Sequence, residues 1–200
     1  MTRFHIAGAA GALLGLCAVS ALAAPRGYSL EGGVLDELNY ARTQPQAYAR
    51  VLQDEAYRSR AAGAYDDPAA LREAVAFLSR QPAVAPLSSD EALAEAAGEH
   101  AQVQARDGGV GHVGPRGESL SQRLHRYGAF ASLMGENIAY GYADPREVVA
   151  QLIVDAGVPD RGHRANIFNP AYREVGVACG PHPVYRVMCV TDFSGTLMKR

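Results

Sequence analysis

The C-terminal segment EVGVACGPHPVYRVMCVTDFSG, residues 174–195, constrains the fold of this chain more than any other stretch. Its apolar residues alternate with other residues on both sides of a turn at Gly180–Pro183. This is the pattern of two antiparallel strands joined as a hairpin. The alternating apolar residues are Val175, Val177 and Cys179 before the turn, and Tyr185, Val187, Cys189 and Val190 after it.

Helical patterns fill most of the chain before this hairpin. Apolar residues recur at helical spacing from Leu30 to Leu52, and Pro45 divides the stretch into two helices because proline cannot continue the first one. Further helices are expected in DDPAALREAVAFLSRQP, in SSDEALAEAAGEHAQVQARDGG with a cap near Ser88 or Ser89, in ESLSQRLHRYG and in DPREVVAQLIVDAG. The segment ENIAYGY predicts one more strand. Helices first and a hairpin last indicate an α+β fold with helices packed on a sheet.

The first residues, MTRFHIAGAAGALLGLCAVSALA, have the pattern of a secretory signal peptide. A basic start is followed by an apolar run and by Ala21-Leu22-Ala23, the small-x-small pattern of a cleavage site. A membrane anchor is the alternative, but a spanning helix needs about 20 apolar residues and this run is shorter. We therefore expect residues 1–23 to be a signal peptide and residues 24–200 to be a single secreted or periplasmic domain without a transmembrane segment.

Charge and cysteine content agree with export. The formal net charge is −2 at pH 7 and no Lys/Arg run is present, which argues against a nucleic-acid partner. Cys17 leaves with the signal peptide, so Cys179 and Cys189 remain as an even pair that is expected to form a disulfide in an oxidising compartment. Two buried thiols are the alternative. The pair is not symmetric about Gly180–Pro183, so the hairpin should turn nearer Val184 or carry a bulge.

Three polar residues next to glycine stand in three separate stretches. His112 follows Gly111 in VGHVGPRGE, Glu136 follows Gly135 in MGENIAY, and His163 follows Gly162 in DRGHRANIFNP. Each alone is typical of a solvated surface group. Each also begins or ends a different element, so a fold could bring all three into one cleft. A glutamate buried in an apolar run needs hydrogen-bond partners, and backbone amides or a histidine could supply them.

The motifs GH, GENIAYG and GHRANIFNP, in this order before a C-terminal hairpin, resemble the CAP superfamily. This superfamily groups cysteine-rich secretory proteins, insect-venom allergens and pathogenesis-related class 1 proteins, and the bacterial secreted branch is the nearest match. The stretch LNYARTQPQAYA also resembles the start of that domain, and the resemblance spans about Leu30 to Phe193. The chain departs from the family in having no tryptophan and in reading LIVDAGVPDRGHR before the second histidine.

The resemblance implies a three-layer α-β-α sandwich with a central antiparallel sheet, and a cleft that receives two histidines and two acids. His112 and His163 match the two histidines, Glu136 matches the GEN glutamate, and Glu118 is the best match for the other acid. Neutral imidazoles and carboxylates are ligands for zinc or another divalent cation. We expect His112 and His163 as metal ligands, Glu136 as a ligand or as support behind one, and water or Glu118 as the fourth group.

Three functions fit this pattern. The first is a secreted protein that binds a small apolar ligand such as a lipid or sterol, or an extracellular or envelope protein. The second is a metal-dependent or acid–base hydrolase, peptidase-like, that uses the same cleft. The third is a structural protein of the cell envelope. No residue is assigned as catalytic, because the chain has neither a His-Glu-x-x-His helix nor a Gly-x-Ser-x-Gly elbow. If one metal bridges both histidines, their rings must lie within about 10 Å of each other.

Overall fold

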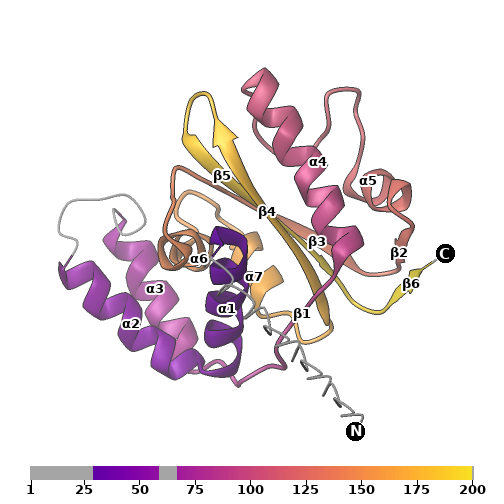
Figure 1. The fold of residues 1–200 in the computed structure, drawn as a ribbon. Coiled ribbons are helices and arrows are strands. Elements are labelled where there is room, and N and C mark those ends of the chain that lie inside the picture. Colours follow the sequence, from indigo (N-terminus) through magenta and orange to yellow (C-terminus); the bar gives the residue numbers. More distant parts are fainter. Residues whose placement is uncertain (1–28, 59–66, 200) are drawn as a thin grey trace, which may run out of the picture.

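A computed structural model describes residues 29–58 and 67–199 of the chain (Figure 1). The expected signal peptide, with Cys17, lies outside the described residues. None of the helices in the described ranges combines the length and the apolar character that a membrane crossing requires.

Seven helices are described, and most begin where the sequence places a cap or a proline. They are α1 (Leu30–Thr43), α2 (Pro45–Arg58), α3 (Pro68–Leu78), α4 (Glu91–Asp107), α5 (Leu120–Arg126), α6 (Pro145–Val154) and α7 (Gly162–Ile167). The break at Pro45 is confirmed. The expected cap of α4 was wrong: the Asp90 side chain accepts a hydrogen bond from the Leu93 amide, while Ser88 and Ser89 form a strand.

The central sheet has the strand order β1-β4-β5-β3. Its strands are β1 (Ser88–Ser89), β4 (Glu174–His182), β5 (Arg186–Ser194) and β3 (Met134–Tyr140). The β4–β5 hairpin and the β5–β3 pair are antiparallel, as expected. The short β1 runs parallel to β4, so the sheet is mixed and not purely antiparallel. A separate antiparallel pair, β2 (Ala129–Ala131) and β6 (Leu197–Lys199), was not expected because three-residue strands carry little periodic signal.

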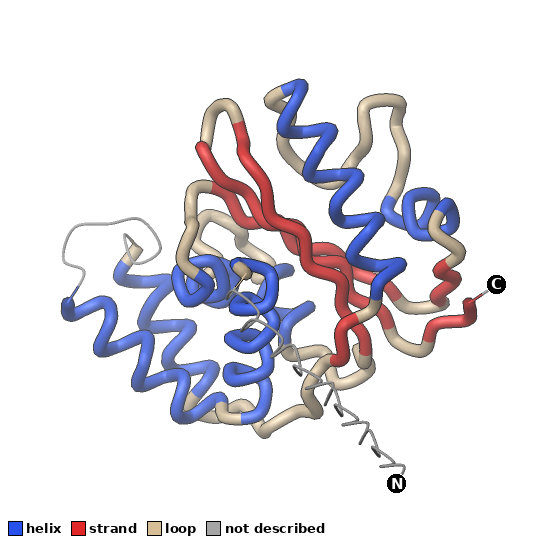
Figure 2. Tube along the Cα trace, in the orientation of Figure 1, coloured by secondary structure: helices blue, strands red, loops and turns tan. Residues whose placement is uncertain are grey.

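Helices cover both faces of the sheet, which gives the three layers that the resemblance implied (Figures 1 and 2). Helices α4 and α5 lie on one face; α1, α2, α3, α6 and α7 lie on the other. Gly176 explains how closely α4 approaches β4, since a Cβ atom there would lie 2.1 Å from backbone atoms of Leu93 and Ala94. The larger core, between the sheet and α1, α3 and α6, is made of residues such as Val34, Leu38, Leu78, Ile153 and Phe193.

The disulfide between Cys179 and Cys189 is confirmed. The two residues face each other directly across β4 and β5, and the pairing continues past Gly180 to His182 and Arg186. The turn therefore comprises residues 183–185, nearer Val184 than Gly180–Pro183, and no bulge interrupts the pairing.

Candidate functional site

The candidate site lies beside β3, the outer strand of the sheet. A cavity of about 370 Å³ opens there, and we call it the histidine cavity. His112 comes from the loop between α4 and α5, whereas His163 comes from α7 on the other face of the sheet. The site thus sits where the two helical layers meet at a sheet edge. The apolar and aromatic part of the lining includes Ile138, Tyr140, Leu152, Ala156, Val158 and Tyr185.

The first imidazole is held by Glu136. The Nδ1 atom of His112 lies 2.8 Å from Oε1 of Glu136, and the other carboxylate oxygen accepts a hydrogen bond from Arg123. Arg123 also donates from Nη1 to the carbonyl oxygen of His112 at 2.9 Å. The Glu136 and Arg123 side chains are almost fully buried, while the His112 side chain is 53% exposed. Buried charges therefore fix a histidine whose ring reaches solvent.

The second imidazole is held by Asp155. Its Oδ1 atom lies 2.6 Å from Nδ1 of His163, and its Oδ2 atom accepts the backbone amides of His163 at 3.0 Å and Arg164 at 3.3 Å. Asp155 ends α6 in the left-handed conformation, with φ 55°. Its side chain is 1% exposed, against 22% for that of His163. The carboxylate therefore orients the ring and also caps α7.

The two rings come close to each other across the cavity. Their centroids lie 6.3 Å apart, with an angle of 41° between the ring planes. This separation meets the 10 Å requirement stated above for a shared metal. In the described residues neither Nε2 atom makes a hydrogen bond, because both carboxylates are on the Nδ1 side. Both Nε2 atoms are consequently available to a ligand.

Burial and neighbouring charges together set the pKa of Glu136 and that of its cross-strand neighbour Asp192. Burial alone would raise the pKa of Glu136, but the hydrogen bond from His112 and the charge of Arg123 outweigh it and lower this pKa. Asp192 is fully buried, and burial together with the negative charge of Glu136 raises its pKa well above the usual range. Glu136 is thus the ionised partner and Asp192 the protonated one.

Glu118 occupies a different place from the other candidates. It does not line the histidine cavity; its carboxylate pairs with Arg116 at 2.8 Å in a neighbouring pocket. Hydrogen bonds from the Arg116 side chain and backbone lower the pKa of Glu118 to about 2. The position of the second acid in the cavity is taken by Asp155.

The glycines beside the candidates have different roles. Gly111 has a φ of 91°, which favours glycine, and its amide donates to the hydroxyl oxygen of Tyr140. Gly135 makes room: a Cβ atom there would lie 2.4 Å from the Tyr172 hydroxyl and 2.9 Å from Oδ1 of Asn166. Gly162, beside His163, has neither reason: its φ is not positive, and a Cβ atom there would come no closer than 3.6 Å to Asp160.

Sequence reasoning missed Asp155, Arg123 and Asp192. A signal for Asp155 was available in the sequence. A negative charge near a helix C-terminus is unfavourable for the helix dipole, so an acid at that position indicates a role other than helix stability. Arg123 follows a common helical pattern and Asp192 sits in an alternating strand, so neither could be distinguished before the pairing of β3 with β5 was known.

The donor set fits a metal only in part. No group of three or more His, Cys, Asp or Glu residues in the described ranges is arranged to hold a metal ion. The site has two imidazoles, and a carboxylate lies at the Nδ1 atom of each. Proteins commonly orient histidine ligands in this way, with the metal on the other ring nitrogen. A metal here would take two nitrogen ligands from the chain and the rest from water or a bound molecule.

Comparison with known proteins places these observations in a family. The chain is 34% identical over 92 residues to the uncharacterized protein YkwD of Bacillus subtilis (strain 168), and the match covers 46% of this chain and 34% of YkwD. It thus spans about a third of the length of that relative.

Two solved structures are similar at 22% identity. One is an extracellular protein containing a SCP domain from Bacillus anthracis str. Ames, with a TM-score of 0.47, covering 65% of this chain and 41% of that one. The other is an outer surface protein of Borrelia burgdorferi, with a TM-score of 0.46, covering 55% of this chain and 77% of that one.

The family described as CAP, the cysteine-rich secretory protein family, matches residues 35–193. This range contains both imidazoles, both of their carboxylates, Arg123 and the disulfide-linked hairpin. Because the match spans most of the chain and the whole of the site, the chain belongs to the CAP family.

Proposed function

We propose that this chain is an exported binding protein whose histidine cavity takes a small apolar molecule with a polar end, of the lipid or sterol class. The observation that carries the proposal is a cavity with apolar and aromatic walls and two oriented imidazoles in its lining. Its volume of about 370 Å³ is in the range of small-molecule sites. Val110 and Tyr185, which line it, are 61% and 45% exposed, so the opening is itself apolar.

A divalent cation such as zinc is the second part of the proposal. The His112 and His163 Nε2 atoms would hold it, because their Nδ1 atoms are engaged by Glu136 and Asp155. When bound, the cation would attract an anionic or carbonyl group at the polar end of the ligand. The disulfide supports the exported setting, because such bonds persist in oxidising compartments.

Titration of the protein with zinc, followed by calorimetry, tests whether the two histidines bind the cation. The wild-type protein should bind one zinc ion, and the double variant His112→Ala/His163→Ala should lose this binding. Asp155→Asn should weaken affinity by about 10-fold or more, since loss of a carboxylate behind a histidine ligand typically costs that much. Affinity should also fall as the solution is made more acidic, because protons compete with the metal for the imidazole nitrogens.

His125→Ala is the matched control, because His125 is exposed on α5 and does not line the cavity. It should bind zinc as the wild type does. Unchanged affinity in a folded double variant would rule out the two-histidine site.

Displacement of a fluorescent fatty acid or sterol tests the apolar cavity. Ala156→Trp would fill the cavity opening and should reduce probe binding about 10-fold or more, whereas Ala171→Trp, on an exposed residue elsewhere, should not. Equal probe binding by both variants would place the apolar site elsewhere on the molecule.

The hydrolase alternative rests on one observation. An imidazole whose Nδ1 is held by a buried carboxylate is also the arrangement of a general base. No Ser, Thr or Cys among the described residues lines the cavity, so water would be the nucleophile. Turnover of peptide or ester substrates that is lost in both His112→Ala and His163→Ala would favour this reaction over binding alone. A wild-type protein that binds neither zinc nor the apolar probe and turns over no substrate would instead favour the structural envelope function.

A further inference from the structure

His182, the last residue of β4, is a polar residue at the tip of the hairpin and yet only 2% exposed. Its Nε2 atom lies 2.9 Å from the carbonyl oxygen of Gly109, in the loop between α4 and α5. Its Nδ1 atom lies 3.2 Å from the backbone nitrogens of both Val184 and Tyr185, in the turn of the hairpin. One buried ring therefore joins two loops that are far apart in the sequence. We call these three hydrogen bonds the His182 latch.

The partners of the latch determine which ring nitrogen carries the hydrogen. A carbonyl oxygen can only accept, so Nε2 carries the hydrogen and donates it to Gly109. The two backbone amides can only donate, so Nδ1 accepts from both and has no hydrogen of its own. The latch therefore requires the neutral ring. A second proton, on Nδ1, would face two N–H groups and would remove both hydrogen bonds of the turn.

Both loops that the latch joins contribute to the wall of the histidine cavity. Val110, Gly111 and His112 line the cavity from the α4–α5 loop, and Tyr185 lines it from the turn. The ring of Tyr185 also contacts that of His182, with centroids 5.2 Å apart. A change in the latch would therefore reach the apolar opening of the cavity.

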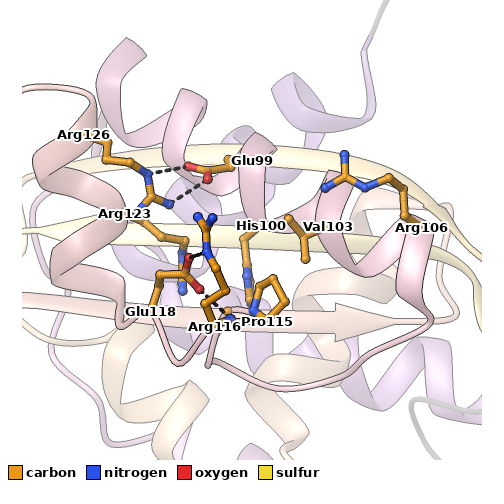
Figure 3. A pocket seen from close by; sticks show the side chains of 10 residues that line it. Glu99, His100, Val103, Arg106, Pro115, Arg116, Glu118, Arg123 and Arg126 are labelled. Carbon is orange, nitrogen blue, oxygen red and sulfur yellow. Dashed lines mark hydrogen bonds and ion pairs between the residues drawn. The ribbon is translucent and has the colours of Figure 1, made fainter.

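Other attachments of the α4–α5 loop lie further along the chain than the latch. Arg116 pairs with Glu118 at 2.8 Å beside α5 (Figure 3), and Arg123 donates to the carbonyl oxygen of His112. These contacts hold the part of the loop that follows Gly111. Loss of the latch should consequently loosen the turn and the beginning of the loop at Gly109, and should leave His112 attached to Arg123.

The charged and titratable side chains near the ring come from four places. They are Tyr140 of β3, Tyr185 of the turn, Arg186 of β5, and Arg106 and Asp107 at the end of α4. The hydrogen bonds of the ring itself are to backbone groups. His112 and His163 differ, because a carboxylate lies at the Nδ1 atom of each. Within the described residues, no such ion pair offsets the loss of the latch when His182 is protonated.

We infer that His182 is an acid-sensitive latch of the histidine cavity, closed when the ring is neutral and released when the ring is protonated. Histidine is the side chain whose charge normally changes between about pH 5 and pH 8. Release frees the turn and the beginning of the α4–α5 loop. The cavity should then bind its ligand more weakly, because the ordering of its opening costs free energy on binding. This effect on the ligand rests on the proposed function, whereas the latch itself can be measured without a ligand.

NMR spectroscopy and hydrogen exchange of the wild-type protein test the latch directly. Proton–nitrogen spectra of the imidazole should show the His182 hydrogen on Nε2 at about pH 7.5, and hydrogens on both ring nitrogens at about pH 5. The protection of the Val184 and Tyr185 amides, corrected for the effect of pH on exchange itself, should fall about 5-fold over this range. This change corresponds to the net contribution of about one hydrogen bond.

Substitutions of His182 separate the latch from the other histidines. An asparagine side chain can accept hydrogen bonds from the amides that follow it, as in an Asx turn, and it does not titrate. His182→Asn should therefore protect the Val184 and Tyr185 amides equally at both pH values, and His182→Ala should leave them unprotected at both. His125→Asn, which replaces an exposed histidine of α5, is the matched control and should behave as the wild type does.

Binding of a fluorescent sterol, a probe without a titratable group in this range, measures the consequence for the cavity. At about pH 7.5 His182→Ala should bind the sterol severalfold more weakly than the wild type. The loss of affinity between about pH 7.5 and pH 5 should be smaller in His182→Ala than in the wild type, because the variant has no latch to release. Titration of His112 and His163 affects both proteins alike, so the difference between them reports the latch.

Three results would overturn the inference. The first is a His182 hydrogen on Nδ1 in the neutral ring. The second is protection of the Val184 and Tyr185 amides that does not change with pH, or that falls equally in His182→Asn. The third is an equal loss of sterol affinity with pH in the wild type and in a folded His182→Ala, which would show that the latch does not control the cavity. A wild-type protein that binds no sterol at either pH would contradict the proposed function instead, and the exchange data would still decide whether the latch exists.

Discussion

At the scale of single residues, the chain places two carboxyl groups side by side and gives them opposite protonation. Glu136 and Asp192 face each other across β3 and β5, both buried, and the Arg123 guanidinium pairs with Glu136. Two adjacent carboxylates cannot both remain ionised at low cost, so one loses its proton to solvent and the other keeps it. Arg123 and His112 decide that Glu136 is the ionised one.

This pair predicts a specific effect of pH on stability. Asp192 has a folded-state pKa above its unfolded value, so the unfolded chain releases this proton first, and the Asp192 contribution falls as pH rises above about 4. Glu136 acts in the opposite direction: its contribution is present above its unfolded pKa and is lost as pH falls through the lowered folded value.

Asp192→Asn should therefore stabilise the protein at pH 7 by about 1 kcal/mol or more, with the gain shrinking towards pH 4. Urea unfolding of both proteins across this pH range measures the difference. Parallel stability curves for the variant and the wild type would mean that folding does not raise the pKa of Asp192.

At the scale of elements, the β4–β5 hairpin supports the rest of the sheet, because β5 pairs with β3 and β4 pairs with β1. The hairpin also carries Asp192 opposite Glu136, so its register fixes the pair described above. The disulfide joins the two strands directly across the ladder, near the turn.

Removing the disulfide should cost stability without changing the site. The variant Cys179→Ala/Cys189→Ala should lose about 2–3 kcal/mol, the value expected for a loop of this length. Zinc binding should remain as in the wild type, because the bond lies outside the histidine cavity. Titration of the unfolded, unreduced wild-type protein should find no free thiol; two thiols would show that the bond is absent in solution.

At the scale of the whole molecule, two residues of α1 hold distant loops in place. Asn39 exchanges two hydrogen bonds with the backbone of Leu87, at 2.7 and 3.0 Å. Arg42, fully buried, donates to the carbonyl oxygens of Ala85, Ile167, Asn169 and Tyr172. The Asn-x-x-Arg pattern at the start of the domain thus connects α1 to the approach to β1 and to the segment that follows α7.

Arg42→Ala should consequently destabilise the protein by about 3 kcal/mol or more, since it leaves several buried carbonyl groups without a donor. Arg72→Ala, an exposed arginine on α3, should stay within about 0.5 kcal/mol of the wild type. Urea unfolding compares the two variants, and an equal loss in both would refute the role assigned to Arg42.

Most of the elements, the disulfide and three polar residues of the site could be predicted from local patterns in the sequence. Proline, cap residues and apolar periodicity are local signals, so α1, α2, α3 and α6 and the hairpin could be predicted from them. His112, Glu136 and His163 could be found because each stands in a short motif that resembles a family. The spacing of the two cysteines predicted either a turn near Val184 or a bulge, and the strand register shows the turn without a bulge.

Which groups accompany these residues depends on how the folded chain packs. Asp155 reaches His163 because the left-handed end of α6 turns its side chain back over α7. Arg123 and Asp192 meet Glu136 because α5 packs over β3 and β5 pairs with it in one particular register. Glu118 is an acid, but it lies in a neighbouring pocket, where it pairs with Arg116. Contacts between segments far apart in the chain depend on packing and strand register, which leave no local pattern in the sequence.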